Sequence, residues 1–359
     1  MTDIRIHVRA SREYDVVIGK GLITKAGQLV REAVPKATKI LIVSETNVAP
    51  LYLDTVKGSL EGEGFEVEEV VFEAGEKSKN IDTIARMWGV MAKAGFTRTD
   101  AVVALGGGVT GDMAGFAAAT FLRGIDVVQI PTSLLAQVDA SVGGKTGIDL
   151  PEGKNQVGSF HQPSMVIEDT DCLKTLSPDK FTEGLGEVLK YAFIMDKELL
   201  KVLEIYEDKG NLQNDTQTLT DIVKACVADK VEVITEDEFD TGRRQILNFG
   251  HTIGHVIERD SNFTKDHGVC VAMGMGIIAD ACLAAGMTDK ATHDRMISLI
   301  EAYGLPSGDG ITPDEAVAGV MNDKKKRGNT ISLIVVRNIG EAEICPMDPE
   351  GLRIFLSRR

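Results

Sequence analysis

The sequence lacks the features that mark several classes of protein. It has five scattered cysteines and no Cys-x-x-Cys pair, which excludes a disulfide framework and favours reduced thiols in a cytoplasm. No continuous apolar run reaches the ~18 residues of a membrane-crossing helix, and the mean hydropathy is zero. The first residues alternate apolar and polar, which indicates a strand and not a signal peptide. We therefore expect a cytoplasmic protein with no membrane partner.

The chain also lacks a net positive charge. Its formal net charge is −15 at pH 7, so we expect no nucleic-acid partner. Basic residues nevertheless gather near the glycine-rich and histidine-rich motifs, namely Lys145, Lys154, Lys190, Lys230, Arg244, Lys324 and Lys325. A basic site within an acidic chain indicates a small anionic substrate.

The 359 residues are ample for two packed domains. Buried apolar strands such as Lys39–Val43 and Ala101–Leu105 alternate with helical segments, which is typical of a parallel α/β sheet. From Pro178 the pattern is almost all helical. We predict an α/β nucleotide-binding domain with a Rossmann-like parallel sheet at residues 1–176, and a mostly α-helical domain at residues 177–359.

A glycine turn follows the strand Ala101–Leu105. Gly106, Gly108 and Gly111 match G-x-G-x-x-G between a predicted strand and a predicted helix, the context that a dinucleotide-binding turn requires. Such glycines let backbone N–H groups approach a pyrophosphate at a helix N-terminus. The usual ribose-binding acid at the end of the next strand is missing, because Asp126 begins its strand. A nucleotide site and a tight structural turn both fit this pattern.

Three of the six histidines fall in one stretch, from residue 244 to residue 267. Interpreted as one continuous helix, the stretch has a single polar stripe made of Arg244, Asn248, His251, His255 and Glu258. Two imidazoles one turn apart can share a cation, and His267 is a candidate for a further ligand. A pair of core or capping histidines is the alternative.

Other segments have structural interpretations. Gly184 and Gly186 interrupt a predicted helix, and each glycine costs a helix about 1 kcal/mol, so we infer that another backbone comes close there. Residues 137–163 are rich in glycine and are expected to be irregular. The lysine run at residues 324–326 is typical of a solvated face.

Together the motifs resemble the 3-dehydroquinate synthase family of sugar-phosphate cyclases. The resemblance runs nearly end to end and rests on Gly75–Lys79, Gly106–Asp112, Pro131–Ser133, Asp139–Lys145, Gly153–Asn155, Glu183–Lys190, Leu247–His255 and Asp323–Lys325. It implies conversion of 3-deoxy-D-arabino-heptulosonate 7-phosphate into 3-dehydroquinate and phosphate, in the shikimate pathway of aromatic amino acid biosynthesis. It also implies bound NAD, one divalent metal (usually zinc, with cobalt as the alternative) and a homodimer.

The resemblance also implies roles for individual residues. The implied metal ligands are Glu187, His251 and His267, with His255 binding substrate instead. The residues implied for NAD are Glu45, Gly75, Glu76, Lys77, Ser78, Lys79, Gly107, Gly108, Val109, Thr110, Gly111, Asp112, Thr132, Ser133, Lys145, Lys154, Cys172, Leu173, Lys174 and Thr175. The residues implied for the sugar phosphate are Asp139, Lys145, Asn155, Lys190, Lys230, Arg244, Asn248, His255 and Lys325 or Lys324, with Arg123 contributed across the dimer.

The chain departs from the family's pattern in places. Glu45 and Asp240 stand where the family usually has Asp and Glu, and Gly328 is shifted relative to the glycine after the lysine pair. Three rival functions stay open: a sister cyclase whose substrate lacks a carboxylate, a metal-dependent polyol dehydrogenase that releases NADH, and a nucleotide-binding protein without activity.

Overall fold

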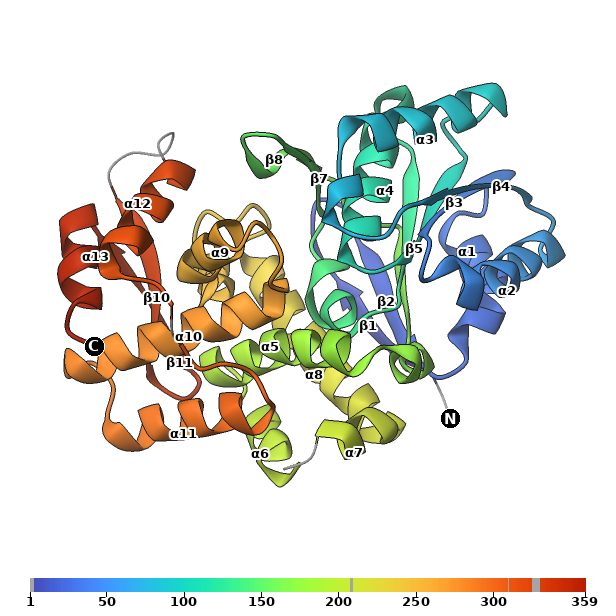
Figure 1. Ribbon diagram of the computed structural model, residues 1–359. Helices are drawn as coiled ribbons and strands as arrows, with labels where there is room; N and C mark the ends of the chain where they lie inside the picture. The colour runs from blue at the N-terminus through green and yellow to red at the C-terminus, as the bar shows by residue number, and fades with distance from the viewer. Residues whose placement is uncertain (1–2, 207–208, 309, 325–329) are drawn as a thin grey trace. The chain divides into compact units, whose positions relative to one another are not determined.

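The computed structural model in Figure 1 describes residues 3–206, 209–308, 310–324 and 330–359, with the backbone alone at residues 209 and 322–324. Contacts divide the chain into two compact units. Unit 1 contains residues 1–176 and 216–238, and unit 2 contains residues 177–215 and 239–359. The domains predicted from the sequence are continuous, whereas here residues 216–238 group with unit 1, because their helix packs on its sheet.

Unit 1 is built on a seven-stranded sheet with the order β1-β2-β9-β6-β5-β3-β4. Its strands are β1 (Ile4–Val8), β2 (Tyr14–Gly19), β3 (Lys39–Glu45), β4 (Glu66–Phe72), β5 (Ala101–Gly106), β6 (Asp126–Pro131) and β9 (Met165–Asp169). Every neighbouring pair is parallel except β1 with β2. All six residues of β5 are buried, as expected of a parallel strand with both faces covered. The predicted Rossmann-like fold class is confirmed.

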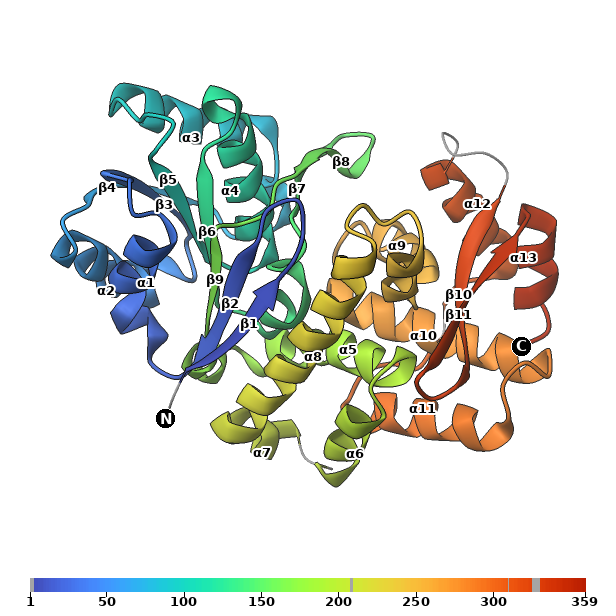
Figure 2. The same ribbon diagram turned by 180° about the vertical axis from the view of Figure 1, so that it is seen from behind.

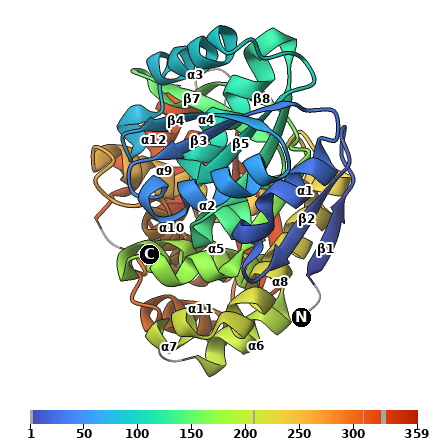
Figure 3. The same ribbon diagram turned by 90° about the vertical axis from the view of Figure 1, so that its right-hand side faces the viewer.

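Alternate residues of β3 enter two different apolar cores. Ile40 and Ile42 pack in a cluster with residues of α1 (Ala26–Ala33) and α2 (Ala49–Gly62), which Figure 3 shows side by side. Leu41 and Val43 pack in a second cluster with residues of α3 (Ile81–Lys93) and α4 (Gly108–Thr120). The two-residue period of a strand therefore places helices on both faces of the sheet.

The sheet reverses its direction of growth between β3 and β5. The chain runs from β3 to β4 at the edge and then returns past β3 to β5. Ligands of such sheets bind beyond the carboxyl ends of the strands at this switch point. Because β3 ends at Glu45 and β5 leads through Gly106 into α4, the acid and the glycine turn predicted for NAD lie at the same edge.

The expectation of an irregular segment at residues 137–163 is wrong for most of its length. β7 (Lys145–Leu150) pairs antiparallel with β8 (Gly153–Phe160). A Cβ on Gly158 would lie 2.2 Å from the carbonyl oxygen of Thr146, and one on Gly147 would lie 2.7 Å from that of Val157. The glycines that suggest a loop therefore allow two strands to approach closely.

Unit 2 is mostly helical, as predicted, and also contains a two-stranded hairpin. Its helices are α5 (Pro178–Ile194), α6 (Lys197–Ile205), α7 (Lys209–Asn214), α9 (His251–Asp260), α10 (His267–Ala284), α11 (Lys290–Ala302), α12 (Pro313–Lys324) and α13 (Pro349–Leu356). Its hairpin pairs β10 (Ile331–Asn338) with β11 (Glu341–Met347). The remaining long helix, α8 (Thr216–Glu236), lies beside β1 and β2 of unit 1, as Figure 2 shows.

Helix α10 is long and apolar enough to cross a membrane, with a mean hydropathy of 1.6 over 18 residues. The sequence contains no continuous apolar run of ~18 residues here, because His267 and Asp280 interrupt the segment. The segment passes a test on mean hydropathy because that test tolerates both residues. In the structure 72% of the window is buried. The buried core helix of a folded domain passes the same test, so α10 is weak support for a membrane span.

Glycines allow α5, α9 and α10 to touch through their backbones. A Cβ on Gly186 of α5 would lie 2.3 Å from the carbonyl oxygen of Gly268 on α10. A Cβ on Gly274 of α10 would lie 2.0 Å from the carbonyl oxygen of Gly250, just before α9. Real Cβ atoms do not come this close to other atoms, so no other residue fits at these positions without a shift. The close approach inferred for the glycines of the Glu183–Lys190 segment is confirmed at Gly186.

The predicted continuous helix through Arg244 and Glu258 is wrong. A 3₁₀ helix, η6 (Arg243–Asn248), ends before Gly250, and α9 begins at His251. Gly250 has a φ of 80°, which non-glycine residues rarely adopt. The chain turns there, so Arg244 and Asn248 do not continue the polar stripe of α9.

A glycine substitution tests this packing. We expect Gly186→Ala to lower the free energy of unfolding by about 3 kcal/mol, because the new methyl group meets backbone that cannot move alone. Denaturant unfolding followed by circular dichroism measures the loss. Gly58→Ala on α2 is the matched control, because its Cβ meets nothing within 4 Å, and it should gain up to about 1 kcal/mol. Equal effects of the two variants would contradict the packing role.

Candidate active site

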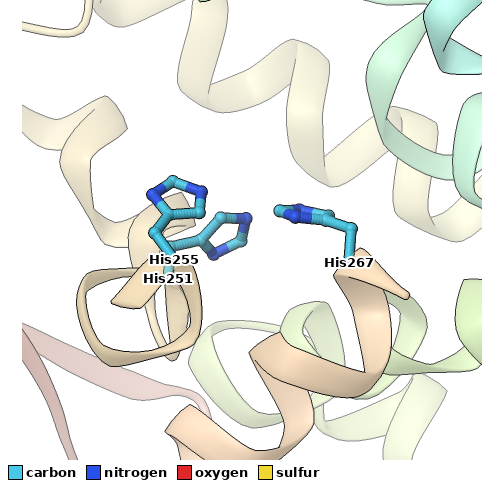
Figure 4. A group of neighbouring side chains, drawn as sticks. All are labelled: His251, His255 and His267. Atoms are coloured by element: carbon cyan, nitrogen blue, oxygen red, sulfur yellow. The ribbon is translucent and has the colours of Figure 1, made fainter. Parts of the chain in front are cut away.

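Three imidazoles form a cluster in unit 2. His251 and His255 lie one turn apart on α9, and His267 is the first residue of α10. One ring nitrogen from each lies within 4.8 Å of the others, and Figure 4 shows the His267 ring facing the pair. Imidazole nitrogens at this spacing are suited to bind one divalent cation.

A buried carboxylate reaches the same cluster from α5. Oε1 of Glu187 lies 3.4 Å from Nε2 of His251 and 3.4 Å from Nε2 of His267. The side chain is 0% exposed, and neither carboxylate oxygen accepts a hydrogen bond of good geometry from any described residue. Lys190 Nζ lies 2.5 Å from Oε2 as an ion-pair partner. The geometry therefore offers two overlapping ligand sets, the three histidines or Glu187 with His251 and His267.

Hydrogen bonds orient two of the rings. Nδ1 of His251 donates to the carbonyl oxygen of Phe249 over 3.2 Å, and Nδ1 of His267 donates to Oε2 of Glu258 over 3.2 Å. Each contact leaves Nε2 toward Glu187, which is how outer partners set the ring orientation of metal-binding histidines. The sequence places Glu258 only on the predicted polar stripe and does not indicate this contact with His267.

The charges of the cluster favour a cation. Burial alone would raise the pKa of Glu187, but the Lys190 ammonium and the imidazoles of His251 and His267 lower it well below its usual value. Burial alone would lower the pKa of His267, but Glu187 and Glu258 raise it. Glu187 is therefore ionised, and the surroundings of the His267 ring favour positive charge. Two imidazoles and one carboxylate fit the donor set of a catalytic zinc site, which leaves coordination positions for substrate.

In unit 1 the glycine turn forms an uncapped helix N-terminus. The N-cap residue of α4 is Gly107, which has no side chain to cap it, and the first turn of α4 contains no acid. Thr132 N–H donates to the Gly106 carbonyl, and a Cβ on Gly107 would lie 3.4 Å from Ser133 Oγ. Free N–H groups and the helix dipole favour an anion such as a pyrophosphate at this point.

Lys79 joins residues predicted for NAD to a residue predicted for substrate. Its ammonium donates to Oδ2 of Asp112 over 2.6 Å and to Oδ1 of Asn155 over 2.5 Å. The Lys79 side chain is only 4% exposed, whereas that of Asp112 is 23% exposed. Nearby, Lys154 Nζ lies 3.0 Å from Oε1 of Glu76. The structure thus brings these five residues together.

Asp149 is a contributor that the sequence analysis missed. Its Oδ1 accepts the backbone N–H of Asn155 over 2.8 Å, and Asn155 has a φ of 53°. The contact supports a left-handed conformation that costs an L-residue energy. Only the pairing of β7 with β8 brings Asp149, at the register shift between Ile148 and Leu150, to the backbone of Asn155.

Asp139 and Lys230 form a second pair within unit 1. The ammonium of Lys230, on α8, donates to both the side-chain and backbone oxygens of Asp139. Asp139 lies in a single turn of π-helix, η4 (Ala136–Ala140). The pair joins residues 91 positions apart, a contact that the sequence could not reveal.

The other predicted residues lie as follows. Gly75 precedes η2 (Glu76–Ser78), which carries Lys77 and Ser78, and Lys145 opens β7. Cys172, Leu173, Lys174 and Thr175 lie in η5 (Thr170–Thr175), where the Tyr52 hydroxyl contacts Thr175 Oγ1 at 2.5 Å. Arg123 is exposed in η3 (Phe121–Arg123). Arg244 is buried in η6, and Asn248 closes it. The Lys324 side chain and Lys325 lie outside the described residues.

Comparisons with known proteins cover nearly the whole chain. Residues 69–183 match the model of the 3-dehydroquinate synthase N-terminal domain, and residues 184–326 match that of the C-terminal domain. The 3-dehydroquinate synthase of Clostridium kluyveri is 42% identical over 85% of this chain and 84% of its own. That of Streptococcus pneumoniae is 42% identical over 96% of both chains.

Solved structures share the fold. The 2-epi-5-epi-valiolone synthase of Streptomyces hygroscopicus, solved with NAD⁺ and Zn²⁺, has a TM-score of 0.87 and 27% identity, over 99% of this chain and 98% of its own. A 2-deoxy-scyllo-inosose synthase has a TM-score of 0.86 at 23% identity, over 98% and 99% of the two chains, and supports the fold alone. The resemblance found in the motifs is confirmed: the chain belongs to the 3-dehydroquinate synthase family.

Proposed function

We propose that the chain converts 3-deoxy-D-arabino-heptulosonate 7-phosphate into 3-dehydroquinate and phosphate. The carrying observation is Glu187 beside His251, His267 and Lys190, in a chain whose relatives at 42% identity are 3-dehydroquinate synthases. The reaction oxidises the substrate with NAD transiently, eliminates phosphate, returns the hydride, opens the ring and closes a carbocycle by an intramolecular aldol step. It belongs to the shikimate pathway.

Glu187, His251 and His267 hold one divalent cation in this proposal. A cation bound there acidifies a substrate hydroxyl and eases hydride transfer to NAD. The supporting observation is Oε1 of Glu187, which is buried, lies 3.4 Å from both imidazole nitrogens and accepts no hydrogen bond of good geometry from a described residue. A cation shared with the two imidazoles would satisfy this oxygen. Zinc is the proposed metal, with cobalt as the alternative, and His255 contacts substrate.

NAD binds at the carboxyl ends of β3 and β5 in this proposal. The N-terminus of α4 would receive the pyrophosphate of NAD, and Glu45, at the end of β3, would bind a ribose. Glu45 is one methylene longer than the Asp usual in the family, and its Oε2 accepts the backbone N–H of Asn47 over 2.6 Å. Support also comes from the 27%-identical valiolone synthase, which was solved with NAD⁺.

The cationic residues hold the anionic groups of the substrate. Lys145, Asn155, His255 and Arg123 are proposed for the phosphate. Lys230, Arg244 and Asn248 are proposed for the carboxylate, because an ion in a closed site needs a charged partner. Asp139 and Lys190, with Lys325 or Lys324, complete the substrate contacts. These groups orient and stabilise anions more than they transfer protons.

A homodimer in the cytoplasm completes the proposal. Arg123 would then act in the site of the partner chain. Arg123 has a φ of 72° and its neighbour Leu122 a φ of 50°, and Leu122 is 39% exposed. Two strained, exposed residues in succession are more typical of a functional contact than of a plain loop.

The first prediction separates the two ligand sets of the metal. We expect Glu187→Ala and His251→Ala to lose bound zinc, measured by mass spectrometry of the purified protein, and His255→Ala to retain it while losing activity. His293→Ala on α11 is the control, because its imidazole pairs with Asp280 at 2.8 Å outside the cluster. Loss of zinc from His255→Ala with retention in Glu187→Ala would favour the three-histidine set.

The second prediction concerns Lys79. Lys79→Met leaves Asp112 without its buried partner, so we expect the free energy of unfolding to fall by about 1–3 kcal/mol and NAD affinity to fall at least tenfold. Titration calorimetry with NAD measures the second effect. Lys57→Met is the control, because it removes an exposed pair with Glu69 at 3.1 Å and should cost under about 1 kcal/mol. Unchanged NAD affinity in Lys79→Met would argue against the nucleotide role.

The third prediction tests the reaction and its substrate. The wild type should release phosphate from the heptulosonate phosphate without net NADH, and should be poor with sedoheptulose 7-phosphate, which lacks the carboxylate. Arg244→Ala should lose at least a hundredfold in kcat/KM on the acid substrate, roughly the cost of a charge-assisted contact. The neighbouring exposed Arg243→Ala is the control. Equal turnover of both sugars would assign the chain to the sister cyclases, and net NADH would assign it to the polyol dehydrogenases.

A further inference from the structure

A fully buried carboxyl group in unit 1 has no role in the function described so far. Glu168 is the fourth residue of β9 and is 0% exposed. Its neighbour Ile167 enters the apolar core shared with α1 and α2, so the alternation of a strand turns Glu168 to the opposite face of the sheet. On β2 its pairing partner is Ile18.

The hydrogen bonding of Glu168 is incomplete. Its Oε1 accepts the Ser141 hydroxyl over a long 3.4 Å, and its Oε2 has no hydrogen-bond partner in the part of the chain that the structure describes. A buried ionised carboxylate in this state is far costlier than a neutral acid. Burial raises the pKa of Glu168 well above its ordinary value, although Ser141 and Lys230 act against that rise.

The groups around Glu168 come from three neighbouring elements. From α8, Lys230 is the cation that acts on it. From η4 and its C-cap come Asp139, which holds the Lys230 ammonium, and Ser141, whose hydroxyl donates to Glu168. From β2, which pairs with β9, the Tyr14 hydroxyl accepts the N–H of Gly143, two residues after Ser141, over 3.1 Å. Asp139 therefore pairs directly with the Lys230 ammonium, and Glu168 contacts the same segment through Ser141 and feels the charge of Lys230.

We propose that Glu168 is kept as a neutral acid and is a positioning residue for Lys230. While Glu168 is neutral, the Lys230 ammonium binds Asp139 and is oriented toward the substrate. An ionised Glu168 would compete for it, and would gain most from it, because Oε2 has no other donor among the described residues. Lys230 would then turn away from Asp139. The role of Lys230 in binding substrate rests on the proposed function, whereas the protonation state of Glu168 does not.

The first arm of the experiment measures protonation and needs no activity. Glu168→Gln keeps the shape and neutrality of the acid. In the wild type the unfolded chain loses this proton near pH ~4.3 while the folded chain keeps it, so stability falls as pH rises above that value, by up to about tenfold in the unfolding equilibrium per pH unit. The amide loses nothing in this way, so the stability of Glu168→Gln relative to wild type should rise steadily from pH 5 toward pH 8.

The outcome of this arm is decided by the slope against pH. Glu68→Gln is the matched control, because it removes an exposed glutamate from β4 of the same sheet, and its difference from wild type should change little. The difference in the free energy of unfolding between Glu168→Gln and the wild type could instead stay constant, or change in favour of the wild type, as pH rises. Either result would mean that Glu168 is ionised in the folded protein and would overturn the proposal.

The second arm uses the enzyme loaded with NAD and zinc. We expect Glu168→Gln to keep kcat/KM within about threefold of wild type at pH 7, and the fall of kcat/KM at high pH to begin at a higher pH than in the wild type. A hundredfold loss at pH 7, or a high-pH limb identical to that of wild type, would contradict positioning. If the wild type releases no phosphate from the heptulosonate phosphate, the proposed function fails, and the first arm still reports on Glu168.

Discussion

The candidate metal cluster depends on helices that touch through their backbones. Gly186 meets Gly268, and Gly274 meets Gly250, at distances that exclude any other side chain. Only this approach lets Glu187 from α5 reach the imidazoles of α9 and α10 at 3.4 Å. A side-chain layer between the helices would separate their axes by several ångströms more, beyond the reach of a shared cation. Glycine lowers the stability of each helix because it loses more conformational entropy on folding than other residues do. The close packing that it allows offsets this loss.

A second constraint organises unit 1. Parallel strands bring their carboxyl ends to one edge of the sheet, so residues from distant loops meet there. Lys79 joins Asp112, which follows β5, to Asn155 on the β7–β8 hairpin. Asp139 is joined to Lys230 of α8 in the same unit. Each buried cation in this region thus has a carboxylate partner, as the cost of burying a charge requires.

The two units rely on opposite electrostatic devices. In unit 2 a carboxylate is kept ionised by Lys190 and the imidazoles, despite burial. In unit 1 burial raises the pKa of Glu168, which has one long hydrogen bond and a cation already engaged by Asp139. The surroundings therefore shift the pKa of two buried glutamates in opposite directions.

The fold class and the family follow from local features of the sequence. Continuous apolar runs such as Lys39–Val43 and the helical pattern after Pro178 are local signals, and the family motifs are contiguous segments of the chain. The break at Gly250 and the β7–β8 hairpin were missed, because a glycine has the same letter whether it loosens a loop or admits a neighbouring backbone. The three-dimensional packing is needed to see that Glu187 meets His267 in unit 2. In unit 1 it is needed to see that Lys230 holds Asp139 and that Glu168 is buried against Ser141. These contacts join residues 27 to 91 positions apart, and no local pattern records which distant side chains the packing of a sheet or of helices will bring together.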